Sequence, residues 1–123
     1  MTKNDQDILA RAYAMLSALR QNISQIKDYR VEEKYVDEFH NVLNKLESVG
    51  IETAEFRIPD SLVKPILRAS WIDGDGTSRD RYSEEKYIER SFILTKIDAV
   101  LGYFEIITSE KPRRIGFRKP DTE

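Results

Sequence analysis

Two segments in the first half of the chain repeat apolar residues at intervals of three and four, the spacing of one face of an α-helix. The segments run from about Asp5 to Tyr29 and from about Val31 to Val49. Asn4 precedes the first as an expected cap, and Gly50 follows the second where a left-handed residue commonly ends a helix. The apolar positions are Leu9, Ala12, Leu16, Leu19, Ile23 and Ile26, then Val31, Tyr35, Phe39, Val42, Leu46 and Val49.

The joint at Tyr29 and Arg30 contains neither Gly nor Pro. We therefore expect a tight helical hairpin there, with one long bent helix as the alternative. Further on, Pro59 and Pro65 exclude a long helix, and the stretch from Pro65 to Trp71 is expected to form a short helix with Pro at its first position.

Residues Asp73 to Arg81, "DGDGTSRDR", are rich in turn-forming residues and predict an exposed loop. Ser83 is then expected to cap a final long helix that continues to about Thr108, with Glu84 and Glu85 in its first turn. The apolar set of this segment is wider than one stripe: Ile88, Phe92, Ile93, Leu94, Ile97, Val100, Leu101, Phe104 and Ile107.

These elements predict an all-α fold. We expect an antiparallel bundle of three main helices plus one short helix over 65–71, forming a single domain over residues 1–109. Residues 110–123 are expected to form a basic, flexible C-terminal tail.

The chain contains a near-repeat, because "EEKY" occurs at Glu32–Tyr35 and again at Glu84–Tyr87. One interpretation is that both segments follow the same rules for starting a helix, with acidic residues in the first turn. Duplication of a helical hairpin is the less favoured alternative, because the segments that precede the two copies share neither length nor pattern.

Composition narrows the class of protein. The 123 residues are 40% hydrophobic and 34% charged, which is the balance of a folded domain. There is no Cys, and no apolar stretch approaches the length that spans a membrane, so we expect a cytoplasmic protein without a membrane partner. The net charge of −2 disfavours nucleic-acid binding over the whole surface.

No catalytic or metal site is indicated, and no cofactor is expected. His40 is the only histidine, and a partly buried polar role is favoured over catalysis. The segment from Asp73 to Glu84 has the length of a calcium loop, but Ser78 replaces the required Gly and two arginines fall inside it. An enzyme that uses carboxylates and His40 is kept only as a remote alternative.

The broad apolar surface of the last helix favours a non-enzymatic protein-interaction or oligomerisation module, of unknown pathway, whose partner is a second copy or another protein. Coverage by the chain's own helices is the competing explanation. Small residues on the same helix would allow close approach of a partner. The predicted homodimer interface comprises Ile93, Ala99, Val100, Gly102 and Ile107.

The alternative function is nucleic-acid or anion binding in a small regulatory protein. It uses a basic edge over residues 79–90 and the tail over residues 111–119, in which Ile115 and Phe117 alternate with cations. The candidate residues are Arg79, Arg81, Lys86 and Arg90 on the edge, and Arg113, Arg114, Arg118 and Lys119 in the tail.

Overall fold

A computed structural model of the chain describes residues 2–109. It contains three α-helices and a three-stranded antiparallel sheet. In chain order the elements are α1 (Lys3–Ser24), β1 (Arg30–Glu32), α2 (Glu33–Glu47), two short 3-10 turns (Ala54–Phe56 and Asp60–Leu62), β2 (Lys64–Ile72), β3 (Ser78–Glu89) and α3 (Arg90–Ser109).

The helices form one layered body, in which α1 packs against both α2 and α3. Their apolar faces meet in a single core that includes Leu16, Phe39, Leu43 and Ile97, all completely buried. At the α1–α3 contact the rings of Tyr13 and Phe104 pack in a T-shaped arrangement, and Arg20 forms an ion pair with Asp98. The core thus accounts for the helical periodicity of all three segments.

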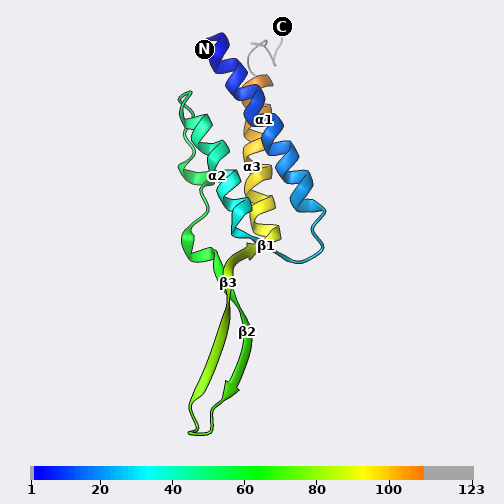
Figure 1. Cartoon of the computed structure of the whole chain (residues 1–123). Coiled ribbons are helices and arrows are strands. Elements are labelled where there is room, and N and C mark those ends of the chain that lie inside the picture. The colour runs from blue at the N-terminus through cyan, green and yellow to red at the C-terminus, as the bar shows by residue number, and fades with distance from the viewer. Residues whose placement is uncertain (1, 110–123) are drawn as a thin grey trace.

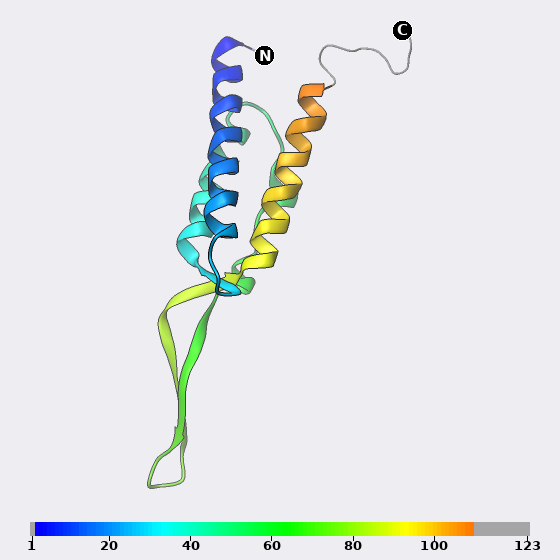
Figure 2. The ribbon, with the colours of Figure 1, turned by 90° about the vertical axis from the view of Figure 1, so that its right-hand side faces the viewer.

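The strands β2 and β3 form a long hairpin that projects away from the helices (Figures 1 and 2). The sheet order is β1-β3-β2, and β1 pairs only with the last three residues of β3. We call residues 64–86, which extend beyond β1, the arm. At about 3.3 Å per residue, the nine residues of β2 span roughly 30 Å.

The prediction of an all-α fold, and of a purely helical bundle, is wrong because the structure mixes helices with this antiparallel sheet. Residues 65–71 belong to strand β2, so Pro65 is the second residue of an edge strand and does not start a helix. Ser83 lies within β3, and α3 begins only at Arg90. The second "EEKY" copy is therefore strand, whereas the first copy spans the end of β1 and the start of α2.

Helix ends also differ from the expectation at several points. Thr2, not Asn4, caps α1 by accepting a hydrogen bond from the Asp5 amide at 3.1 Å. Residues 25–29 form a loop into β1, so the first connection is neither a tight helical hairpin nor a bent helix. The Gly50 prediction is confirmed: its φ is +90°, and the Gly50 and Ile51 amides donate to the Glu47 and Leu46 carbonyls.

Candidate functional site

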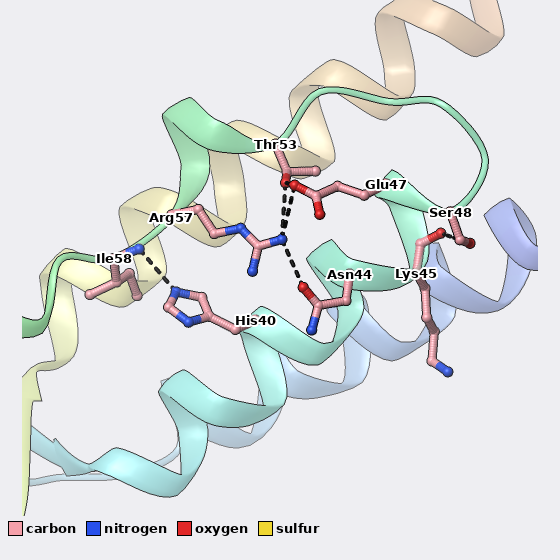
Figure 3. A network of polar contacts seen from close by, with 8 residues as sticks. All are labelled: His40, Asn44, Lys45, Glu47, Ser48, Thr53, Arg57 and Ile58. Atoms are coloured by element: carbon pink, nitrogen blue, oxygen red, sulfur yellow. Dashed lines mark hydrogen bonds and ion pairs between the residues drawn. The ribbon is translucent and has the colours of Figure 1, made fainter.

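The first candidate site is a polar network between α2 and the connection that follows it (Figure 3). The Thr53 hydroxyl donates to Glu47 Oε2 at 2.6 Å, and Arg57 forms an ion pair with the same carboxylate at 3.1 Å. Arg57 also donates to Asn44 Oδ1 at 2.8 Å. Thr53 is only 1% exposed, so its hydroxyl is closed to a substrate. The network fastens the connection to the helix and does not resemble a catalytic centre.

His40 belongs to the same contact between α2 and the connection. Its Nε2 accepts a hydrogen bond from the Ile58 amide at 3.0 Å, and the ring is partly buried, as the sequence indicated. Burial, aided by the positive charge of Arg57, lowers the pKa of His40 below its ordinary value. A neutral imidazole that accepts from a backbone amide has a positioning role in the fold.

The second candidate is the arm, whose large apolar side chains remain in solvent. Exposed fractions are 50% for Leu67, 46% for Trp71, 73% for Ile72 and 53% for Tyr82. Leu67 and Tyr82 are cross-strand partners, and Trp71 and Ile72 lie next to the turn. No residue from 64 to 87 is buried. Such a surface on a protruding element is typical of an interaction site.

Local polar contacts shape the arm without giving it a core. The turn places Gly76 at φ +84°, and its amide donates to the Asp73 carbonyl at 2.9 Å. Asp73 also accepts from the Trp71 indole at 3.0 Å and from Arg79 at 2.6 Å. Nearer the bundle, Ser83 Oγ accepts from the Ile66 amide at 2.9 Å where the strand register shifts. These contacts lie within the hairpin and leave its apolar side chains exposed.

A pocket of about 390 Å³ lies where the arm joins the bundle. Arg30 and Lys64 give it cationic groups, and Glu89 gives it one carboxylate. Within residues 2–109, the Arg30 Nε is a buried donor without a hydrogen-bond partner. The apolar lining includes Tyr29, Leu62, Pro65, Ile66, Tyr87 and Phe92.

The predicted homodimer residues lie mainly inside the bundle. Ile93 and Val100 are 0% exposed, and Ile107 packs against the same core. Gly102 is partly exposed and Ala99 is exposed on α3. The side chains of Ile93 and Val100 are thus covered by the chain itself, and Ala99 is the member of the set that faces solvent.

The basic residues of the predicted 79–90 edge do not form one patch. Arg79 pairs with Asp73 near the turn, whereas Arg90 lies at the start of α3 and donates to the Ile26 carbonyl. Arg81 and Lys86 are exposed and have no ion-pair partner within residues 2–109. The tail candidates Arg113, Arg114, Arg118 and Lys119 lie outside the described residues.

The structure of residues 2–109 was searched for metal-ligand clusters and for membrane-spanning helices. Residues 2–109 hold no cluster of three or more His, Asp or Glu side chains that could bind a metal ion. The segment from Asp73 to Glu84, which has the length of a calcium loop, forms a turn followed by part of strand β3. No helix within the same residues combines the length and apolar character needed to cross a membrane.

A scan against protein-family models finds no match, and searches of curated proteins and of solved structures find none either.

The sequence analysis did not predict the arm, although the sequence contains a signal for it. "DGDG" separates two stretches that contain β-branched and aromatic residues, which is typical of a hairpin.

Proposed function

We propose that the protein is a non-enzymatic protein-interaction or oligomerisation module and that the arm is its docking element. The observation that carries the proposal is the exposure of Leu67, Trp71, Ile72 and Tyr82 on a hairpin without a core of its own. A two-stranded hairpin is at best marginally stable alone in water. Contact with a partner protein would cover these side chains and order the strands.

The charge of the arm favours a protein partner over a nucleic acid. Its cations and carboxylates balance, whereas phosphate binding depends on an excess of cations. The basic residues are Lys64, Arg68, Arg79, Arg81 and Lys86, and the acidic residues are Asp73, Asp75, Asp80, Glu84 and Glu85. Nucleic-acid binding through the 79–90 edge and the 111–119 tail stays a second proposal, supported by the exposed Arg81 and Lys86. The cytoplasmic location expected from the sequence also stays a prediction.

A photo-cross-linking pair tests the docking element. Tyr82 on the arm and Tyr13 on α1 are both exposed tyrosines, at 53% and 44%, so each is replaced by the similar benzoylphenylalanine. In a nuclease-treated cell extract we expect a protein adduct from position 82, retained at high salt, and none from position 13.

Two results would contradict the proposal. If position 82 gives no protein adduct, the arm is not a docking element. If, in a parallel extract without nuclease, its adduct is nucleic acid and disappears as salt is raised, the second proposal takes precedence, because salt weakens phosphate contacts far more than apolar ones.

A further inference from the structure

The pocket where the arm joins the bundle has the size and the lining of a small-molecule site. Its volume is about 390 Å³, and most of its lining residues are apolar or aromatic. Sites for small ligands in proteins are mostly apolar cavities of this size, with a few polar groups that fix the orientation of the ligand. The charged residues of the lining therefore indicate which ligand fits.

Arg30 gives the pocket a positive charge without a paired carboxylate. Its cross-strand partner is Glu89, but the two side chains form no ion pair. The Arg30 guanidinium lies over the Tyr29 ring, 4.5 Å from the ring centre, and its Nε is buried without an acceptor among residues 2–109. Buried donors and charges are costly when they lack a partner. An anion bound beside the guanidinium would compensate its charge.

Lys64 adds a second cation on the same face of the sheet. Arg30 lies opposite Glu89 of β3. Lys64 lies opposite Tyr87, two positions before Glu89 on the same strand. Cross-strand partners share a face of the sheet, and so do residues two positions apart on one strand. Lys64 also forms no ion pair in the part of the chain that the structure describes, so both cations are available to one ligand.

The charges in the pocket favour a ligand with a single negative charge. Glu89 offsets one of the two lining cations, which leaves an excess of one positive charge. A carboxylate matches this excess. A phosphate group carries close to two negative charges at neutral pH, and Glu89 would repel it more strongly.

We propose that this pocket binds a small organic monocarboxylate with an aromatic or otherwise apolar body. The carboxylate pairs with Arg30 and Lys64, and the body packs against the apolar lining, formed by Tyr29, Leu62, Pro65, Ile66, Tyr87 and Phe92. This inference goes beyond the proposed function, because none of the exposed side chains that carry the docking proposal lines the pocket.

A titration of the full chain, followed by its backbone amide signals in NMR spectra, tests the site. The probe is phenylacetate, and we expect saturable shifts of pocket amides such as those of Arg30, Ile66 and Tyr87. The neutral control is phenylacetamide, which should bind about tenfold more weakly because it cannot form charge-assisted hydrogen bonds. Acetate, which lacks the ring, and phenyl phosphate, which has the larger charge, should also bind more weakly than phenylacetate.

Charge variants locate the bound carboxylate. Arg30→Met keeps a long apolar side chain and should weaken phenylacetate binding about tenfold. Arg81→Met is the matched control, because Arg81 is an exposed arginine of the arm outside the pocket, and it should leave the affinity unchanged. Glu89→Gln removes a repulsive charge and should strengthen binding about twofold. Lys64→Met, at an exposed position, replaces Arg30→Met if circular dichroism shows that the latter does not fold.

Several results would overturn the inference. The pocket is not a carboxylate site if phenylacetate causes no saturable shift there, if phenylacetamide binds equally well, or if Arg81→Met weakens binding as much as Arg30→Met. Acetate or phenyl phosphate that binds more tightly than phenylacetate would contradict the proposed class of ligand. Docking by the arm is tested separately by the cross-link at position 82, so the two proposals can fail independently.

Discussion

The helical bundle and the arm bury their apolar residues to very different extents. In the bundle, side chains such as Phe39 and Ile97 are fully enclosed by neighbouring helices. In the arm, no residue from 64 to 87 is buried, and Ile72 is 73% exposed. The bundle therefore contains its own stabilising contacts, whereas the arm has apolar surface that no other part of residues 2–109 covers.

The largest expected difference in stability is between removing a buried aromatic side chain and removing an exposed one. Phe39→Ala removes a ring that is 0% exposed and should lower the free energy of unfolding by about 3–5 kcal/mol. Trp71→Ala removes a larger ring from the arm and should change the free energy of unfolding of the monomer by less than about 0.5 kcal/mol. Urea denaturation followed by helical circular dichroism compares them. Equal losses would mean that the arm belongs to the same cooperative core.

The next comparison concerns side-chain hydroxyls. Thr53→Val leaves the Glu47 carboxylate and Arg57 without their buried partner and should cost about 1–2 kcal/mol. Ser70→Ala removes an exposed hydrogen bond to Asp80 on the arm and should cost less than about 0.5 kcal/mol. The same denaturation experiment measures both. A larger loss at Ser70 would contradict the distinction between the two regions.

Two glycines with positive φ offer a matched backbone test. Gly50 ends α2 and Gly76 forms the arm turn, and neither has an atom within 4 Å of an added Cβ. Gly50→Ala should lower global stability by about 1 kcal/mol because a left-handed conformation strains a Cβ. Gly76→Ala should leave global unfolding unchanged and speed hydrogen exchange in the arm alone. A shift in global stability from Gly76→Ala would show that the turn is coupled to the bundle.

The smallest expected effect is a pH dependence that arises in the bundle. Because the folded state lowers the pKa of His40, it binds the proton less well than the unfolded chain, whose value is about 6.5. His40 therefore stabilises the fold above that pH, and the contribution is lost as the pH falls. Arg57 acts in the same direction as burial, and Asp37 and Asp60 oppose it.

His40→Gln keeps an acceptor for the Ile58 amide but does not titrate. The unfolding free energy of the natural chain, minus that of this variant, should be constant above about pH 7 and should decrease as the pH falls below about 6.5. A difference that does not change with pH would contradict the prediction that the neutral His40 imidazole stabilises the fold.

The bundle could be predicted from the sequence because helical periodicity reports directly on a shared core. The faces of α1 and α2 and the Gly50 cap follow from local residue types. The wide apolar face of α3 was ambiguous: the same residues fit a dimer or coverage by α1 and the connection, and only the tertiary packing of Ile93 and Val100 shows the second.

The arm could not be predicted in the same way because its strands lack a buried face. Acidic residues at Glu84 and Glu85 suit a helix start, and Pro65 suits a first helical turn, so residue preferences favour a helix at both places. Register shifts near Leu67 also break the alternation that marks a regular strand. Pairing between β2 and β3, which determines the structure here, is a contact between segments that residue preferences alone do not reveal.

The most direct test of docking through the arm is the protein adduct from benzoylphenylalanine at position 82, measured at low and high salt. The adduct should form at both salts, because apolar contacts carry most of the interface. A variant that also has Leu67→Ser and Trp71→Ser should lose the adduct with its helices intact. An adduct that persists in this variant, or the absence of any protein adduct from position 82, would contradict the account.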